Sequence, residues 1–204
     1  MTTLNTLSTL LLAGTCAALV QGCAGSNAAE DTTKAPAAKT AATSTSSAEL
    51  VEIKLVDKID EDRGYCLDIA GGKGESAPTD KGLQAHTCYD YTGEILVDQQ
   101  FDTALMKQDQ FKIPYFNVCM AVGSLQTGAA IELASCNNAE TQQFTLQANG
   151  QLVAKAKPEL CVTVSATEKR SGRGGSPVHV MRPLSLETCS ADQKTYQTWT
   201  TFKL

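Results

Sequence analysis

The amino-acid sequence predicts an all-β domain made of three similar repeats, which follows a polar N-terminal tail. Two observations carry this prediction. Three short motifs recur in the same order three times after residue 50, and apolar and polar residues alternate with a period of two around them. Residues 50–204 contain no long stretch with the amphipathic pattern of a helix. We therefore expect many short strands joined by turns.

Length, charge and cysteine content narrow the class of protein. The 204 residues are enough for one ordinary domain and a tail. A formal net charge of −5 without a basic block argues against binding to nucleic acid, which requires lysine and arginine to neutralise phosphates. The two histidines, His86 and His179, are too few for a multi-histidine metal site. Eight cysteines in so short a chain are typical of a secreted protein with disulfides.

Residues 1–22 have the features of a secretory signal peptide. They carry no charged side chain, and two short apolar runs at 10–13 and 17–20 are separated by a stretch that contains Thr15. This apolar core is too short for a membrane-spanning helix, which needs about 20 apolar residues. We therefore expect residues 1–22 to be removed from the mature protein.

Residues 20–23, Val-Gln-Gly-Cys, resemble a bacterial lipobox. The resemblance implies that Cys23 is acylated and becomes the new N-terminus, so that a lipid anchors the protein to a membrane of the bacterial cell envelope. The alanine after this cysteine resembles outer-membrane sorting in a Gram-negative host. The alternative is ordinary cleavage near Ala24 or Ala29, which gives a free secreted protein.

Residues 23–49 are predicted to form a disordered linker behind the lipid anchor. From Ala24 to Glu49 the sequence has no leucine, isoleucine, valine or aromatic residue, so it cannot form a hydrophobic core. A flexible chain of this length spans roughly 28 Å, taking about 5.5 Å × √n. Such a linker would hold the folded domain, residues 50–204, away from the membrane surface.

Three motifs define the repeats of the folded domain. The first is a cysteine followed by apolar, variable and apolar residues, at 66–69, 119–122 and 161–164. The second ends in a cysteine that apolar residues precede by five and three positions, at 83–88, 131–136 and 184–189. The third is glutamine, any residue and an aromatic ring, in Gln99 and Phe101, Gln142 and Phe144, and Gln197 and Trp199. The predicted repeats cover about 51–105, 106–152 and 153–204.

Each repeat is expected to contain two strands that are joined by a turn and closed by a disulfide. The strands are the first two motifs, and glycine-containing turn segments separate them at 70–74, 123–124 and 172–177. Six cysteines allow fifteen pairings, of which pairing within each repeat is the economical one. The predicted disulfides are Cys66–Cys88, Cys119–Cys136 and Cys161–Cys189. Each would stabilise the fold by about 3 kcal/mol by restricting the unfolded chain.

With these motifs, residues 51–204 resemble the ricin-type β-trefoil lectins, a family marked by three Gln-x-Trp repeats. Two of the three copies here have phenylalanine in place of tryptophan. The resemblance implies a β-trefoil of about twelve strands, in three lobes around a pseudo-threefold axis. It also implies that the rings of Phe101, Phe144 and Trp199 are buried at this axis.

Strand alternation points three polar side chains of the first repeat away from the core. Asp68 lies between two apolar residues, so its side chain is expected on the opposite face of the strand. The same alternation in 83–86 places Gln84 and His86 on the outward face. We therefore expect Asp68, Gln84 and His86 to leave the core together.

The resemblance implies that these residues belong to a sugar site. In ricin-type lectins a carboxylate accepts hydrogen bonds from two neighbouring hydroxyls, a flat ring packs against the sugar, and amides complete the pocket. Carried over by position, the carbohydrate-binding residues are Asp68, Gln84, His86, Asp98 and Gln99. The resemblance favours galactose or N-acetylgalactosamine as the ligand.

The other two repeats lack the carboxylate and the ring at the equivalent positions. The second repeat has Ala121 and Ala134 there, and the third has Thr163 and Glu187. We therefore expect one working site at most. The three repeated glutamines are expected to be structural, because all three repeats keep them.

Several charged residues have more than one interpretation. Lys169, Arg170 and Arg173 form a small basic loop that could meet an anionic glycan or a lipid headgroup, although a solvated turn is the favoured interpretation. Residues 57–62 form an acidic stretch that matches no ion-binding template. Asp68 could accept backbone hydrogen bonds in a turn instead of contacting a sugar.

The sequence contains no phosphate-binding loop, no nucleophile elbow and no metal-ligand spacing. We therefore expect a non-catalytic carbohydrate-binding protein that has no cofactor or metal and whose partners are glycans. One alternative is a toxin-delivery or adhesion subunit with a protein partner, because lipobox, polar linker and degenerate trefoil also resemble the lectin-like subunits of cytolethal distending toxins. A lesser alternative is a protease inhibitor that acts through the loop at 168–177.

Overall fold

The computed structural model describes residues 49–204, so the predicted signal peptide, Cys23 and all but the last residue of the linker lie outside the described residues. The described chain is all-β, as predicted. Its thirteen strands are β1 (Leu50–Leu55), β2 (Tyr65–Ile69), β3 (Leu83–Thr87), β4 (Phe101–Asp102), β5 (Lys112–Ile113), β6 (Val118–Val122), β7 (Ile131–Ser135), β8 (Phe144–Leu146), β9 (Leu152–Ala154), β10 (Lys157–Val164), β11 (Arg170–Ser171), β12 (Val180–Thr188) and β13 (Trp199–Phe202).

Helical structure is limited to short turns between the strands. The α-helices have four residues each and are α1 (Thr103–Met106) and α2 (Lys194–Gln197). The 3₁₀ turns are η1 (Gly74–Ser76), η2 (Thr79–Lys81), η3 (Asp90–Thr92), η4 (Glu140–Gln142) and η5 (Ala191–Gln193). Over residues 49–204 no helix is long and apolar enough to cross a membrane.

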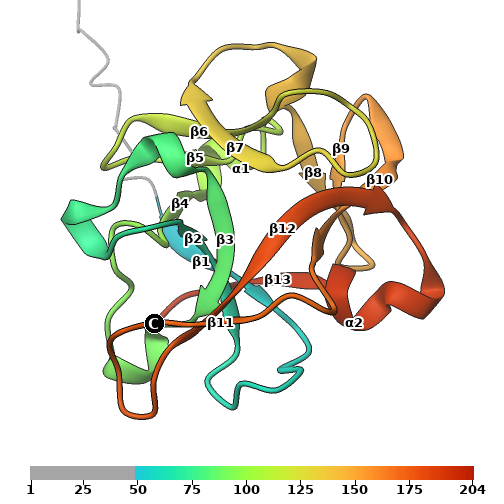
Figure 1. Cartoon of the computed structure of the whole chain (residues 1–204). Helices are drawn as coiled ribbons and strands as arrows, with labels where there is room; N and C mark the ends of the chain where they lie inside the picture. Colours follow the sequence, from blue (N-terminus) through green and yellow to red (C-terminus); the bar gives the residue numbers. More distant parts are fainter. Residues whose placement is uncertain (1–48) are drawn as a thin grey trace, which may run out of the picture. The chain divides into compact units, whose positions relative to one another are not determined.

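All strand pairs are antiparallel and fall into two sheets (Figure 1). The larger sheet has the order β13-β1-β2-β3-β12-β10-β9-β8, with β4 paired to β1 and β11 paired to β12. The smaller sheet is β5-β6-β7. The predicted strand pairs are therefore present as β2–β3, β6–β7 and β10–β12, one in each repeat.

The three hairpins share one register, which makes their positions equivalent. The residue two after the first cysteine pairs with the residue four before the second in every repeat; these pairs are Asp68 with Gln84, Ala121 with Glu132, and Thr163 with Ser185. Each hairpin is closed by the predicted disulfide, and the pairing is Cys66–Cys88, Cys119–Cys136 and Cys161–Cys189. The pairing within repeats is therefore confirmed.

The repeated glutamines hold the chain on both sides of the second cysteine. The Gln142 side chain accepts a hydrogen bond from the Asn137 amide and donates one to the Ser135 carbonyl, at 2.8 and 3.0 Å. Gln99 and Gln197 make the same two contacts in their repeats; their partners are Tyr89 and Thr87, and Ser190 and Thr188. An amide suits this position because it offers an acceptor and a donor together. These contacts, two for each glutamine, support the structural role expected for the three residues.

The aromatic residues of the third motif are in the core, as the sequence predicts. Phe101, Phe144 and Trp199 are at most 1% exposed. The ring of Phe111 makes edge contacts with Phe101 and Phe144, which joins the first and second repeats. The Trp199 indole N–H donates to the Val162 carbonyl at 2.9 Å, so its one polar atom is satisfied.

The third repeat departs from the other two because its second strand is longer. β12 has nine residues, whereas β3 and β7 have five each. Its last residues pair with β10, and its first residues reach the first repeat, where Met181 pairs with His86 and Pro183 with Gln84. In Figure 1, β12 runs beside β3. The hairpin of β11 and β12 therefore lies against the first repeat.

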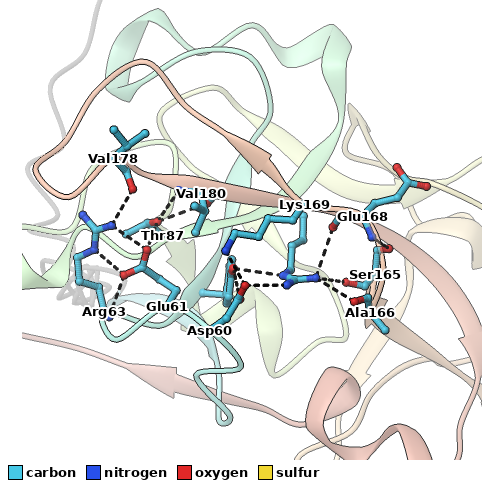
Figure 2. Close-up of polar contacts among 12 residues, drawn as sticks. Asp60, Glu61, Arg63, Thr87, Ser165, Ala166, Glu168, Lys169, Val178 and Val180 are labelled. Carbon is cyan, nitrogen blue, oxygen red and sulfur yellow. Dashed lines mark hydrogen bonds and ion pairs between the residues drawn. The ribbon is translucent and has the colours of Figure 1, made fainter.

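Polar contacts fasten this hairpin to the loop between β1 and β2 (Figure 2). Asp60 accepts from Arg182 at 3.0 Å and from Lys169 at 2.6 Å. Glu61 binds Arg63, whose guanidinium also donates to the carbonyls of residues 177 and 178. The acidic stretch at 57–62 thus provides ion-pair partners for arginine and lysine, which explains why it resembles no ion-binding loop.

Candidate functional site

A cavity of about 470 Å³ lies beside β3 and is lined by two repeats. We call it the first-repeat cavity. The lining residues are 71–73, Gln84, His86 and Tyr89 from the first repeat, with 171–175, His179 and Met181 from the third. Because the β11–β12 hairpin pairs with β3, the third repeat completes a site that the first repeat begins.

Three rings pack together in the wall of this cavity, and we call His86, Tyr89 and His179 the ring cluster. His86 stacks on Tyr89 with ring centroids 5.1 Å apart, and His179 meets both rings edge-on at 5.2 and 5.3 Å. The Tyr91 hydroxyl lies 2.8 Å from His179 Nε2. A Cβ on Gly175 would lie 2.3 Å from His179 Cδ2, so only glycine allows the loop to approach this ring so closely.

Burial keeps both histidines of the ring cluster neutral at neutral pH. It lowers the pKa of His86 to about 4, and the nearby charges of Arg63 and Lys73 act in the same direction. Burial, Arg63 and Lys73 also lower the pKa of His179. His86 Nδ1 lies 2.7 Å from the Thr87 carbonyl and donates to it in the neutral ring. The cavity wall therefore contains uncharged rings that are largely buried, since His86, Tyr89 and His179 are 6%, 2% and 6% exposed.

Two buried carboxyl groups lie next to the cavity without lining it. Asp68 is fully buried, and its two oxygens accept from Gln84 Nε2 and Gln99 Nε2, each at 2.9 Å. Burial and the neighbouring Asp98 raise the pKa of Asp68 well above its usual value. Asp98 Oδ2 accepts from the Gly74 amide at 2.6 Å, whereas Oδ1 is buried without a partner, and burial raises its pKa too. Both groups therefore resist ionisation.

The structure brings together the five residues predicted for the sugar site, but it corrects their exposure. Asp68 does not leave the core as expected, because the amides of Gln84 and Gln99 cover both of its oxygens. Asp98 and Gln99 are also fully buried. Of the five, Gln84 and His86 line the cavity, and His86 is itself buried at 6% exposed, so Gln84 is the one that leaves the core as expected. β12 pairs along the edge of β3, which brings the third repeat next to these side chains.

Cationic side chains stand at the edge of the first-repeat cavity. Lys73 and Arg173 both line it and are exposed. Lys73 Nζ lies over the Tyr89 ring, 5.0 Å from its centroid, a distance typical of a cation–π contact. The lining contains no aspartate or glutamate. The site therefore combines ring surfaces, one amide side chain and two positive charges.

The sequence-based prediction missed several residues of this site. Lys73, Tyr89, His179 and Met181 line the cavity but lie outside the repeated motifs. His179 and Met181 come from the other end of the domain, and no spacing within the first repeat points to them. The one available signal was the extra length of the third repeat between its two cysteines, 28 residues against 22 and 17.

A second cavity, of about 440 Å³, occupies the corresponding position of the third repeat. We call it the third-repeat cavity. Thr163 and Ser185 line it in place of Asp68 and Gln84, and Glu187 lines it in place of His86. Its lining contains no histidine, tyrosine or cationic side chain. It therefore has no ring on which a ligand could stack.

One group of potential metal ligands exists within residues 49–204, formed by Glu52, Cys66 and Cys88. Its two sulfur atoms are joined in a disulfide, so they are not available as thiolate ligands. Glu52 itself is fully buried, and neither of its carboxyl oxygens has a hydrogen-bond partner. Burial raises its pKa to about 8, so the carboxyl group is protonated at neutral pH.

Comparison with sequence families and solved structures agrees with this architecture. The family described as "Ricin-type beta-trefoil lectin domain" matches residues 57–199. Among solved structures, the agglutinin from Abrus precatorius has a TM-score of 0.52 and 15% identity over 76% of this chain and 47% of its own. No curated protein sequence shows a significant match.

Two further structures are similar over the same part of the chain. A non-toxic homologue of type II RIPs from Momordica charantia, in complex with alpha-methyl-D-galactoside, has a TM-score of 0.52 and 15% identity over 76% of this chain and 48% of its own. The designed 3-fold symmetric protein ThreeFoil has a TM-score of 0.51 and 18% identity, over 76% and 99%. The chain thus spans about half the length of the two plant proteins and the whole of ThreeFoil, and at these identities the likeness is one of fold.

Proposed function

The chain belongs to the ricin-type β-trefoil lectin family, and from this premise we propose that it is a non-catalytic carbohydrate-binding protein whose sugar site is the first-repeat cavity. The observation that carries the proposal is the ring cluster, which lies in the wall of a cavity together with the amide of Gln84. The cavity volume of about 470 Å³ is in the range of sites for small ligands.

The chemistry of a sugar matches this lining. A pyranose ring has an apolar face of C–H groups, which packs against aromatic side chains. His86 and Tyr89 stack on each other, so the sugar would contact the parts of His86 and His179 that stay uncovered, each residue being 6% exposed. The hydroxyls of the sugar need donors and acceptors at fixed positions, and the Gln84 amide supplies both kinds. Because the two histidines are neutral, the sugar face does not have to displace water from a charged imidazole.

In this proposal Asp68 is a positioning residue. Its oxygens hold the amides of Gln84 and Gln99, so it fixes the orientation of Gln84 at the cavity. Asp98 holds the Gly74 amide next to residues 71–73 of the lining and acts in the same way. The neutral core of the ligand would be a galactose or N-acetylgalactosamine type of sugar, in line with the family and with the galactoside bound to the Momordica charantia protein.

We propose further that Cys23 carries a lipid anchor and that residues 23–49 tether the lectin domain to the bacterial cell envelope. A linker span of roughly 28 Å would let neighbouring copies reach the same glycan-bearing surface. Weak single sites then gain apparent affinity through simultaneous binding. Mass spectrometry of the purified protein tests the anchor, because acylation adds the mass of the lipid to a chain that begins at residue 23.

A glycan array tests the lectin assignment, using the full chain with Gln84→Ala and His86→Ala. Their matched controls are Ser185→Ala and Glu187→Ala, which change the equivalent positions of the third-repeat cavity. We expect glycan binding by the wild type, roughly tenfold weaker binding by the first pair, and wild-type binding by the controls, with thermal unfolding curves checking that each variant folds. Absence of binding to every glycan would refute the lectin function, and equal loss in both pairs would refute its location.

A further inference from the structure

The charge of the first-repeat cavity differs from that of the domain around it. The full chain has a formal net charge of −5, yet the cavity lining contains two cationic side chains, Lys73 and Arg173, and no carboxylate. Within residues 49–204 neither of these side chains is in an ion pair. A ligand in this cavity would therefore meet two positive charges that no acidic side chain neutralises.

The two cations come from different repeats and face the same space. Lys73 belongs to the loop after β2, where its ammonium lies over the Tyr89 ring. Arg173 belongs to the loop after β11, which Gly175 brings against the His179 ring. The ion pairs of Asp60 with Arg182 and of Glu61 with Arg63 fasten this loop to the first repeat (Figure 2). These contacts hold the backbone of the loop that carries Arg173 at the cavity.

The acidic groups near the cavity do not cancel this charge. Asp68 and Asp98 are fully buried, do not line the cavity, and have raised pKa values because of their burial. Glu61 is paired with Arg63. The lowered pKa values of His86 and His179, to which Arg63 and Lys73 contribute, are consistent with a positive potential at the ring cluster.

Resting on the lectin function above, we propose that the first-repeat cavity binds an acidic sugar, whose carboxylate or sulfate group is held between Lys73 and Arg173 while its ring packs on the ring cluster. A guanidinium is planar and offers paired N–H donors, which fit two oxygens of a carboxylate or sulfate. A lysine ammonium adds a point charge without fixed geometry. A neutral sugar leaves both cations without an ionic partner, so the acidic form binds more tightly.

The test compares matched glycans on one array: the same galactose-containing core in neutral form, with a terminal sialic acid, with glucuronic acid and with sulfate. The full chain is measured at low and at high salt, beside Lys73→Ala, Arg173→Ala and the control Arg170→Ala. Arg170 is an exposed cation of the same hairpin that lies outside this cavity. Comparing the glycans that carry a carboxylate with those that carry a sulfate shows which of the two acidic groups the cavity prefers.

We expect the acidic forms to bind about tenfold more tightly than the neutral core, and this preference to shrink at high salt. Lys73→Ala and Arg173→Ala should each reduce the ratio of acidic to neutral binding, whereas Arg170→Ala should keep the wild-type ratio. Equal binding of acidic and neutral forms, or a preference that survives both substitutions, would overturn the acidic-sugar proposal while leaving the lectin function intact. Loss of all glycan binding by the wild type would overturn both.

Discussion

The first-repeat and third-repeat cavities have nearly the same volume, about 470 and 440 Å³, and lie against equivalent strand positions, but their linings carry opposite charge. The first has Lys73 and Arg173 and no carboxylate. The third has Glu168 and Glu187 and no cation. The threefold repetition of the backbone therefore produces similar hollows, whereas a few side chains decide what each hollow can bind.

The difference has a source in the strand lengths. Because β12 extends beyond its pairing with β10, it reaches β3 and carries His179, Met181 and the loop with Arg173 into the first-repeat cavity. The third-repeat cavity is lined from the second repeat by Gly128 and Ala130, which carry neither a ring nor a charge, and it has Glu187 where His86 stands in the first. A binding site in this fold thus arises where the symmetry of the repeats is broken.

Removal of the first-repeat disulfide has the largest expected effect on this comparison. The cysteines are 22 residues apart, so the double substitution Cys66→Ser and Cys88→Ser should lower the free energy of unfolding by about 3 kcal/mol. Since the disulfide closes the hairpin that bears Gln84 and His86, glycan binding should fall as well. Urea unfolding and the glycan array measure the two effects.

The matched control is the double substitution Cys119→Ser and Cys136→Ser in the second repeat, which contributes no residue to the first-repeat cavity. It should cost a similar free energy and leave binding unchanged below the unfolding transition. Equal loss of binding in both double variants would mean that the cavity depends on global stability and not on the first hairpin.

The next largest effect is a pH dependence of stability that comes from Glu52. Every buried carboxyl group of residues 49–204 lies in the first repeat, and Glu52 is one of them. Its pKa is raised from 4.5 to about 8 by burial. The folded state therefore holds its proton more tightly than the unfolded state, and stability falls as the pH rises from about 4.5 to about 8. In the wild type this carboxyl group should lower the free energy of unfolding by roughly 2 kcal/mol between pH 6 and pH 9. Glu52→Gln should remove that loss.

Urea unfolding at the two pH values measures this change. The control is Glu187→Gln, which removes a carboxyl group from the lining of the third-repeat cavity and should keep the wild-type difference between pH 6 and pH 9. An unchanged pH dependence in Glu52→Gln would show that another group near the first repeat titrates instead.

Most of the fold could be predicted from the sequence because its signals are local and repeated. Period-two alternation places β2, β3, β6 and β7 within their motifs, and the position of each cysteine predicts its partner. The buried ring of the third motif is equally predictable. The length of β12 is not, because Val180–Pro183 forms a strand by pairing with the two residues of β11 and with β3, which lies far away in the sequence.

The candidate site was predictable only in part, for the same reason. Alternation correctly places Gln84 and His86 toward the cavity. It fails for Asp68, because alternation gives the face of a strand but not what covers that face. The sequence places Arg173 in a basic loop, but no local pattern shows that the ion pairs of Asp60 and Glu61 hold this loop at another repeat.

Reversing one charge in the first-repeat cavity should lower its affinity for an acidic glycan by about tenfold. Arg173→Glu places a carboxylate in the first-repeat cavity and should abolish the preference for acidic over neutral forms. The reciprocal change, Glu187→Arg, gives the third-repeat cavity a cation but no ring. It should therefore gain no measurable binding. Titration of each variant with paired acidic and neutral glycans measures both effects, and binding gained by Glu187→Arg would show that charge alone suffices.

The smallest expected effect concerns Lys169, whose ammonium pairs with Asp60 at the base of the hairpin. Lys169 and Asp60 are 39% and 36% exposed, so water screens the pair, and Lys169→Ala should lower the free energy of unfolding by less than about 0.5 kcal/mol. Arg182 still binds Asp60 and is 7% exposed, so the hairpin stays in place and glycan binding is unchanged. Urea unfolding and the glycan array provide the check. A clear loss of binding in Lys169→Ala would mean that the exposed ion pair, and not the buried guanidinium, holds Arg173 at the cavity.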